Sequence, residues 1–226
     1  MKHLCKFCGK EPPVIKSHVV PEYLYKDLYD EKHRLIIIDE KLKTIGVQQK
    51  GHYEPILCKD CEKYFNQTFE NPCLNFFDQI PHILEGDYLK IDQPCPELKA
   101  LCLSILWRSS QCKDEKWNIS LGPHEEKLRN ALKSKAINFQ THYQIWGFIP
   151  VTDDKRTLKG AVSPPQMKKL EAHHFFVFIC GCIQFCINIS SHRMRELSSE
   201  PLDFGKSLVL KSVHFEKTPS LFHVFN

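Results

Sequence analysis

The chain contains the segments CKFCGK at residues 5–10 and LCKDCE at residues 57–62, and these two stretches decide how its N-terminal part folds. Each segment holds two cysteines separated by two residues, a spacing that lets both thiolates bind the same ion. Gly9 permits the tight turn that the first pair requires, and the second pair stands at the start of a predicted helix. Four thiolates neutralise a zinc ion and leave no open position, which is typical of a structural site. The sequence therefore predicts one structural zinc ion bound by four cysteines: Cys5, Cys8, Cys58 and Cys61.

The length and composition indicate a folded chain of two unequal parts. With 226 residues, of which 42% are apolar, the chain is long for one compact domain and short for two large ones. We expect a zinc-stapled module at residues 1–80 and a larger α+β domain at residues 95–226, separated by a proline-containing boundary. In the larger domain we expect helices packed on an antiparallel sheet. Its predicted elements are an amphipathic helix at 98–110, a helix from 123 to about 133, and strands at 143–151, 174–189 (turned at Gly181) and 207–214.

The 49 residues between Cys8 and Cys58 must form structure of their own. Residues 17–25 predict an extended segment that breaks at Pro21 into a short helix. The apolar residues 35–38 and the region around residues 46–47 predict a strand or hairpin. After the second cysteine pair, residues 62–77 predict a helix.

The distribution of charge and apolar residues limits the partners. The most apolar stretch, residues 175–189, is interrupted by polar residues and is too short to cross a bilayer comfortably, so we expect a buried strand and no membrane association. The first residues contain no apolar run of signal-peptide length, which favours a cytoplasmic location. The formal net charge is only +4, with both signs mixed along the chain. A nucleic-acid partner is therefore allowed, but only through a basic patch that folding assembles.

Cysteine usage favours reduced thiols rather than disulfides. The chain has eleven cysteines, an odd number, and it is large enough not to need disulfide stapling. Seven of them lie outside the two pairs and are expected to pack as small apolar side chains. These are Cys73, Cys95, Cys102, Cys112, Cys180, Cys182 and Cys186.

The segment SHVVP at residues 17–21, placed between the two cysteine pairs, resembles the HNH endonuclease superfamily. The resemblance covers about residues 3–70. It implies a ββα-metal fold, which in this superfamily is often stapled by a structural zinc bound through two Cys-x-x-Cys pairs. It also implies that His18 is the general base that takes a proton from the water attacking a phosphodiester, a task that suits an imidazole titrating near neutral pH. A catalytic Mg²⁺ or Mn²⁺ would then stabilise the charge of the phosphate and of the departing oxygen.

The chain departs from the superfamily pattern at the metal ligands. Ser17 stands where an acidic residue or histidine usually binds the catalytic metal, and Glu62 stands where histidine or asparagine is common. The middle asparagine has no clean equivalent; Glu54 lies closest, with His52 nearby. Carboxylates suit Mg²⁺ and Mn²⁺. The catalytic site is accordingly either rebuilt from Glu54 and Glu62 beside His18, or lost.

Alternative roles stay open for individual residues. His18 could be a core or helix-capping histidine, and Glu62 could simply favour a helix N-terminus. Glu70 is expected to be a solvated charge on a helix face. Trp107 and Arg108 could clamp nucleic acid, but an aromatic core anchor beside an ion-paired arginine is the favoured interpretation.

Three functions are compatible with these features. The first is a metal-dependent endonuclease that hydrolyses DNA or RNA, whose C-terminal domain recognises the substrate or a protein partner; the superfamily suggests a role in bacterial defence or mobile elements. The second is a non-catalytic zinc module that binds nucleic acid or protein, which Ser17 at a ligand position favours. The third is a zinc-stapled protein whose C-terminal domain performs an unrelated function.

Overall fold

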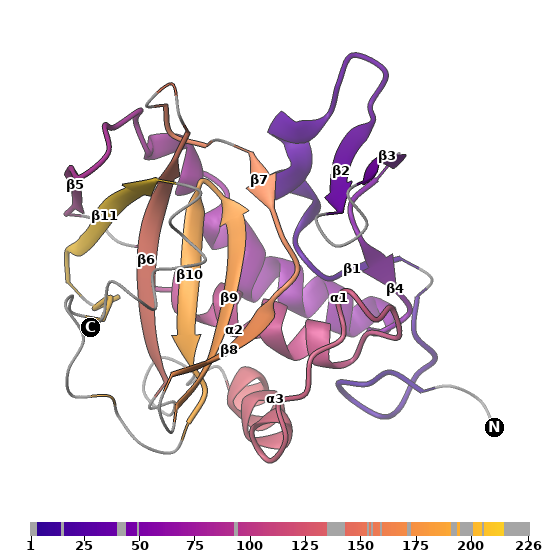
Figure 1. The fold of residues 1–226 in the computed structure, drawn as a ribbon. Coiled ribbons are helices and arrows are strands. Elements are labelled where there is room, and N and C mark those ends of the chain that lie inside the picture. Colours follow the sequence, from indigo (N-terminus) through magenta and orange to yellow (C-terminus); the bar gives the residue numbers. More distant parts are fainter. Residues whose placement is uncertain are drawn as a thin grey trace.

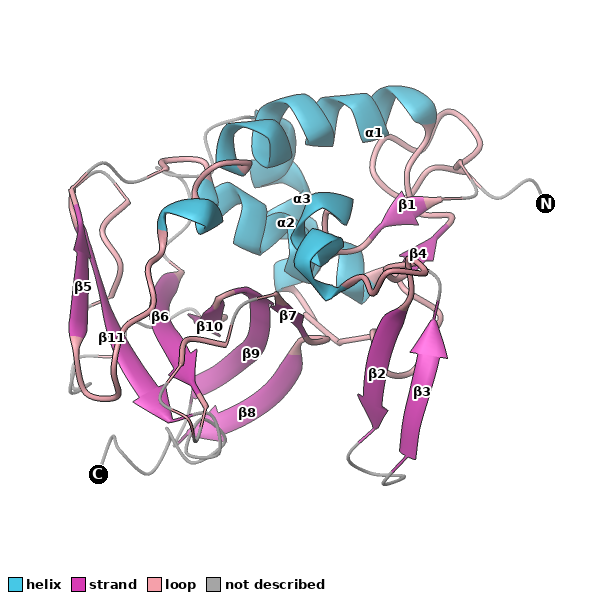
Figure 2. Ribbon diagram, turned by 90° about the horizontal axis from the view of Figure 1, so that it is seen from above, coloured by secondary structure: helices cyan, strands magenta, loops and turns pink. Residues whose placement is uncertain are grey.

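The computed structural model of this chain describes residues 4–14, 16–39, 44–48, 50–92, 95–134, 143–152, 154, 156–158, 160–170, 173–190, 194, 201–204 and 206–214. It is a mixed α+β structure in which helices cover one face of a seven-stranded sheet (Figure 1). Figure 2 shows the helices as a layer above the strands, with a separate hairpin, β2 and β3, projecting to one side.

The large sheet is built mainly from the C-terminal half of the chain. Its strands pair in the order β5-β11-β6-β10-β9-β7, and β8 also pairs with β9. The strands are β5 (Tyr88–Ile91), β6 (Gln144–Val151), β7 (Ala161–Val162), β8 (Gln166–Leu170), β9 (His173–Gly181), β10 (Ile183–Asn188) and β11 (Leu208–His214). The three strand regions expected in this half are therefore confirmed, whereas β5, β7 and β8 were not predicted.

The sheet is mixed and not antiparallel throughout, which corrects the expectation. Strand β11 pairs in parallel with β6, with Lys211 opposite Phe148. Strand β10 runs antiparallel to β6 and ends with Asn188 opposite Gln144, at the end of the sheet where β11 begins. Residues 189–207 therefore link two strands on opposite sides of β6 at the same end of the sheet.

The turn between β9 and β10 depends on a glycine. Gly181 has a φ of +69°, a left-handed conformation that side chains rarely adopt. A β-carbon at this position would lie 2.7 Å from Cδ1 of Phe77. The predicted break at Gly181 is confirmed, and it lies where the sheet meets the segment that follows the second cysteine pair.

Gly181→Ala is expected to lower the free energy of unfolding. The left-handed backbone alone costs about 1–2 kcal/mol for a residue with a β-carbon, and the contact with Phe77 adds to that. Urea denaturation followed by circular dichroism measures the change. Gly86→Ala is the matched control, because Gly86 has a φ of +89° but no atom within 4 Å of the added carbon. Equal losses in the two variants would show that Phe77 does not restrict this turn.

Three α-helices carry the rest of the core. They are α1 (Lys59–Phe65), α2 (Leu98–Ser110) and α3 (His124–Ser134). The last two confirm the predicted helices within a residue. Helix α1 continues into a π-helical turn, η2 (Asn66–Glu70), and then into short 3₁₀ turns, η3 (Asn71–Cys73) and η4 (Phe77–Gln79), so the expected helix at residues 62–77 is interrupted.

Helix α2 is buried on nearly every side, which corrects the expectation of an amphipathic helix. Eleven of its 13 residues are buried, including Ser104, Arg108 and Ser109. A helix buried on nearly every side has no wide polar face exposed to solvent. Its polar side chains are therefore expected to form hydrogen bonds or ion pairs inside the protein. The helix therefore lies in the centre of the protein, between the sheet and the N-terminal segment.

The N-terminal segment forms short strands and a 3₁₀ helix before α1. They are β1 (Ser17–His18), the 3₁₀ helix η1 (Glu22–Leu28), β2 (Leu35–Asp39), β3 (Thr44–Gln48) and β4 (Tyr53–Glu54). Strands β2 and β3 form the predicted hairpin. Strand β1 pairs antiparallel with β4, with Ser17 opposite Glu54 and His18 opposite Tyr53.

One hydrophobic core contains side chains from both expected units, from Cys5 near the N-terminus to Leu210 in β11. The proposed boundary between residues 80 and 95 includes strand β5, which belongs to the large sheet; Pro94 lies outside the described residues. The module at residues 1–80 and the domain at 95–226 thus share apolar packing.

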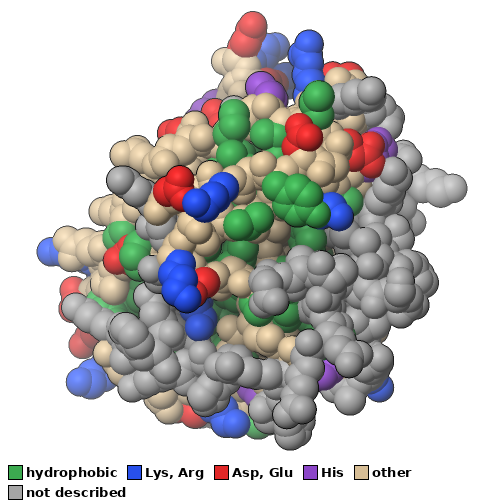
Figure 3. All heavy atoms as spheres, turned by 90° about the vertical axis from the view of Figure 1, so that its left-hand side faces the viewer, with side chains coloured by type: hydrophobic (Ala, Val, Ile, Leu, Met, Phe, Trp, Pro, Cys, Tyr) green, Lys and Arg blue, Asp and Glu red, His purple; other side chains and the backbone are tan. Residues whose placement is uncertain are grey.

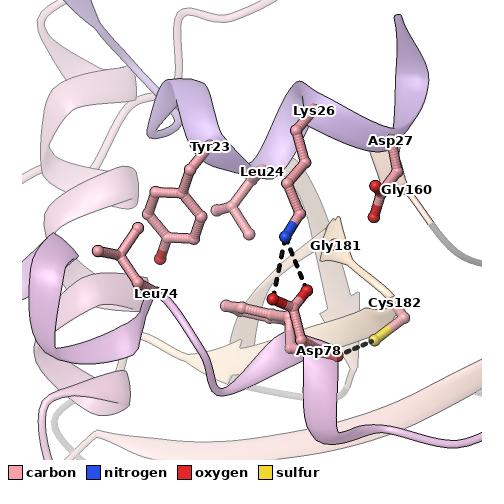
Figure 4. A pocket seen from close by; sticks show the side chains of 10 residues that line it. Tyr23, Leu24, Lys26, Asp27, Leu74, Asp78, Gly160, Gly181 and Cys182 are labelled. Atoms are coloured by element: carbon pink, nitrogen blue, oxygen red, sulfur yellow. Dashed lines mark hydrogen bonds and ion pairs between the residues drawn. The ribbon is translucent and has the colours of Figure 1, made fainter.

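A cavity of about 120 Å³ marks the place where η1 meets the β9–β10 turn (Figure 4). Lys26 extends from η1 across its mouth, with Nζ 2.8 Å from Oδ1 of Asp78. Gly181 and Cys182 form the opposite wall. Such a space admits only a few water molecules, so it belongs to the packing between the N-terminal segment and the sheet.

Candidate metal centre

The four predicted zinc ligands come from two turns that the backbone holds together. Cys5 and Cys8 lie on a tight turn, in which the Gly9 N–H donates to the Cys5 carbonyl at 2.9 Å and Gly9 has a φ of +73°. Cys58 is the N-cap of α1, and Cys61 lies in its first turn. The Lys6 N–H donates to the carbonyl of residue 56, which joins the first turn to the start of the helix.

The geometry of the four sulfurs fits a zinc ion. All four Sγ atoms lie within 4.8 Å of one another. The Sγ atoms of Cys8 and Cys58 are 3.7 Å apart, which matches the roughly 3.8 Å edge of a tetrahedron with Zn–S bonds of about 2.3 Å. Three of the cysteines are buried and Cys8 is half-buried. This four-cysteine cluster could hold a zinc ion, as predicted.

The charges within the cluster also favour a cation. Burial raises the pKa of Cys8, but hydrogen bonds from the backbone of Glu11 and Lys10 and from neighbouring thiols outweigh it and bring this pKa to about 6. Burial raises the pKa of Cys61, and the neighbouring cysteines raise it further. Four thiols this close cannot all ionise unless a cation compensates their charge.

Aromatic packing connects the cluster to the central helix. The ring of Phe7, between the first two cysteines, lies 4.8 Å from that of Phe65 and 5.4 Å from that of Trp107, both in edge-to-face contact. Trp107 is 1% exposed. The interpretation of Trp107 as a core anchor is therefore confirmed, and the four-cysteine cluster is linked to α2 through the ring of Phe7.

Ser17 is occupied by a structural role. Its hydroxyl accepts the Leu57 N–H at 3.0 Å and lies 3.4 Å from the Leu57 carbonyl oxygen. The side chain is fully buried. It therefore joins β1 to the residue that precedes the second cysteine pair.

His18 lies on β1 and is half-buried. Its Nε2 is 2.9 Å from Oε2 of Glu22, one turn along the chain. Burial lowers the pKa of His18, and the negative charges of Glu22 and Glu70 partly oppose this. The imidazole is consequently neutral at neutral pH and keeps one nitrogen able to accept a proton.

Glu62 and Glu70 lie with Arg108 in one polar cluster behind His18. Burial raises the pKa of Glu62, while the positive charge of Arg108 opposes it. Arg108 is completely buried; its Nη1 lies 2.8 Å from Oε1 of Glu70 and donates to the His18 carbonyl at 2.7 Å. Glu70 is thus ion-paired and only 13% exposed, which corrects the expectation of a solvated charge, and the expected ion pair of Arg108 is confirmed.

Glu54 lies apart from His18. Directly opposed residues share a face of a strand pair and neighbours alternate, so the side chains of His18 and Glu54 leave the β1–β4 pair on opposite faces. The Glu54 carboxylate accepts the N–H groups of Lys113 and Asp114 at 2.8–2.9 Å. The structure therefore brings the backbone of His18 and the side chain of Ser17 to Glu62, but directs Glu54 to the loop after α2.

The described residues contain two groups of three or more potential ligands whose donor atoms lie within 4.8 Å of one another. One is the four-cysteine cluster; the other consists of His52, Glu54 and Cys112. Neither includes His18 or Glu62.

Sequence reasoning missed the partners of His18. Glu22 follows it by four residues across a proline, and that spacing was the available signal. The contacts of Arg108 with His18 and Glu70 span 90 and 38 positions, and no local pattern indicates them.

The seven remaining cysteines are all buried, as expected. Cys73 and Cys95 contact each other, with Sγ atoms 2.9 Å apart.

On the side formed by β5 and β11, the described basic and acidic side chains lie beside one another instead of gathering by sign (Figure 3). In the part of the chain that the structure describes, no helix combines the length and apolar character needed to cross a membrane.

Comparison with protein-family models, with curated proteins and with solved structures found no match to this chain.

Proposed function

We propose that this protein is a metal-dependent endonuclease of the HNH type that hydrolyses phosphodiester bonds of DNA or RNA, with His18 as the general base. One observation supports the proposal: the short strand pair β1–β4 is followed by α1, and the Glu62 carboxylate faces the backbone of His18 and the hydroxyl of Ser17. A short antiparallel strand pair followed by a helix is the arrangement that a ββα-metal module requires. The resemblance in sequence supports the same arrangement.

The environment of His18 suits proton abstraction. Burial keeps the imidazole neutral, and the Glu22 carboxylate lies 2.9 Å from Nε2 of His18. The ring accepts the proton of the attacking water, and the negative charge of Glu22 stabilises the imidazolium that forms. Glu22 is thus a positioning residue in this proposal.

Glu62 is the proposed ligand of the catalytic Mg²⁺ or Mn²⁺. Its Oε2 is buried, and among the described residues it has no hydrogen-bond partner. A buried acceptor left in this state points to an ion or water that completes it. Glu62 also lines an open cavity of about 370 Å³ with Asn66 and Asn71, and Mg²⁺ commonly uses one or two carboxylates and keeps several waters. A cation held there would stabilise the charge that develops on the phosphate.

Cleavage of plasmid DNA and of RNA in Mg²⁺ or Mn²⁺ tests the proposal. His18→Ala is expected to lower the cleavage rate by about 10²- to 10⁴-fold, the usual contribution of a general base. His82→Ala is the matched control, because His82 is exposed and should leave the rate unchanged. If His18→Ala cleaves as fast as the wild type, His18 is not the base and the proposal is wrong.

A non-catalytic zinc module that binds nucleic acid or protein is the second candidate. Arg108 favours it, because this buried cation already neutralises Glu70 and stabilises Glu62, which reduces the need for a metal ion. This candidate predicts no cleavage in any divalent cation, together with binding to nucleic acid that weakens steeply with salt if nucleic acid is the partner.

A further inference from the structure

We propose that His52, Glu54 and Cys112 form a second metal site, which takes one transition-metal cation and suits Zn²⁺ best. The donor atoms of the three side chains lie within 4.8 Å of one another. This second site does not depend on the proposed nuclease activity, because the residues proposed for that activity are His18, Glu22 and Glu62.

The fold assembles this site from two distant segments. His52 and Glu54 are two residues apart on either side of Tyr53 in β4, so their side chains leave the strand on the same face. Helix α2 ends at Ser110, and the Cys112 N–H donates to the Ser109 carbonyl at 3.1 Å, which turns the chain back toward β4. The bonds from the N–H groups of residues 113 and 114 to Glu54 hold the two segments together.

The donor set consists of one imidazole nitrogen, one carboxylate and one thiol. Zn²⁺ accepts all three donor types, and three protein ligands leave its fourth position for water or a further ligand. Mg²⁺ prefers oxygen ligands and binds thiols and imidazoles poorly. The chemistry therefore favours zinc over the cation proposed for Glu62.

The His52 ring is held in place by stacking on Trp117, but its Nε2 lacks a hydrogen-bond partner among the described residues. Nε2 of His52 is buried and has no hydrogen-bond partner among the described residues; the nearest acceptor, Oε1 of Glu54, is 3.4 Å away. The imidazole stacks on the ring of Trp117, with centroids 4.8 Å apart and planes 6° from parallel. The stacking fixes the ring plane, a task that a hydrogen bond to the second ring nitrogen usually performs in metal-binding histidines.

The carboxylate keeps capacity for a cation. Oε1 of Glu54 accepts N–H groups from Lys113 and Asp114, whereas Oε2 accepts only the Lys113 N–H among the contacts described. A carboxylate oxygen has two acceptor positions, so Oε2 has one available to an ion. The site is also shielded, because the side chains of His52 and Glu54 are only 16% and 13% exposed.

The local charge favours a divalent ion. The Glu54 carboxylate lies within 4.8 Å of the Cys112 sulfur, and Asp114, two residues after Cys112, donates its N–H to Glu54. Arg108, whose carbonyl accepts the Cys112 thiol at 3.5 Å, carries an opposing positive charge. A bound cation would compensate these carboxylates and ionise the thiol, as metal binding does for a coordinating cysteine.

Sequential loading separates this site from the four-cysteine cluster. The full chain is first given one equivalent of Zn²⁺, which the four thiolates take, and Co²⁺ is then added as the probe. The wild type should bind one further ion and develop a thiolate-to-cobalt charge-transfer band. Metal analysis should then find two ions per chain.

Two variants test the assignment of the ligands. Cys112→Ala and His52→Phe, which keeps an aromatic ring over Trp117, should each reduce the content from two ions to one, and Cys112→Ala should abolish the cobalt band. Cys186→Ala is the matched control, because Cys186 is buried far from these residues in a second apolar cluster, and it should keep two ions. A wild type that binds no second ion, or a cobalt band that persists in Cys112→Ala while the variant remains folded, would overturn the proposal.

Discussion

Cys61→Ser is expected to release the zinc ion and unfold the N-terminal segment of the protein. Structural zinc supplies an apparent binding free energy of about 10–16 kcal/mol near neutral pH, which is as large as the whole stability of a typical protein, about 5–15 kcal/mol. Cys61 is buried in the first turn of α1, so loss of its thiolate leaves three sulfurs and an incomplete shell. Thermal unfolding by circular dichroism, with metal analysis of the purified protein, measures the effect.

Cys186→Ala provides the control for this experiment. It also removes a buried thiol, but one that lies outside the four-cysteine cluster, so the variant should keep one zinc ion in that cluster and unfold near the wild-type temperature. A chelator should reproduce the Cys61→Ser result in the wild type. If Cys61→Ser retains both the metal and the wild-type stability, the four cysteines do not form a structural zinc site.

Arg108→Met is expected to lower the free energy of unfolding by about 3–5 kcal/mol, as found when one partner of a buried ion pair is removed. The guanidinium is completely buried and binds Glu70, the His18 carbonyl and the Ser104 hydroxyl. It also lies 5.4 Å from the centre of the Phe65 ring. Methionine replaces the apolar stem but leaves the Glu70 carboxylate without its cation. Urea denaturation gives the change in free energy.

A second substitution identifies the source of this loss. Arg108→Met combined with Glu70→Gln should be more stable than Arg108→Met alone, because the uncompensated charge is gone. Arg129→Met is the control on α3, where the partner Glu126 is 61% exposed, and it should change stability by no more than about 1 kcal/mol. Similar losses for Arg108→Met and Arg129→Met would contradict a special role for the buried pair.

Local patterns were sufficient to predict the elements that have a regular apolar spacing or that begin or end at a proline or glycine. The apolar spacing in α2, the proline before α3 and the glycine between β9 and β10 each act within a few residues. The spacing of the four cysteines likewise reports chemistry that needs no knowledge of the rest of the chain.

Features that depend on distant contacts were not predictable. Strands β7 and β8 are short and acquire their structure by pairing with β9. The parallel placement of β11 depends on the path of a long connection, which no local signal reports.

The candidate site shows the same division. His18 and Glu62 could be selected from their distance to the cysteines and from residue chemistry. The ion pair of Arg108 with Glu70 and the turn of Glu54 toward residues 113 and 114 follow from the position of α2 in three dimensions. Sequence therefore indicated which residues carry chemistry, while tertiary structure decides how they are grouped.

The burial of α2 means that substitutions far from His18 can still change its position. Its C-terminal arginine holds the backbone of His18, and its apolar faces fill the interior of the whole chain. A volume change in a strand of the sheet can therefore tilt this helix and shift His18 without touching the cysteine cluster. Random mutagenesis that selects for loss of the proposed nuclease activity should consequently recover substitutions scattered through the sheet, and not only those near the four-cysteine cluster.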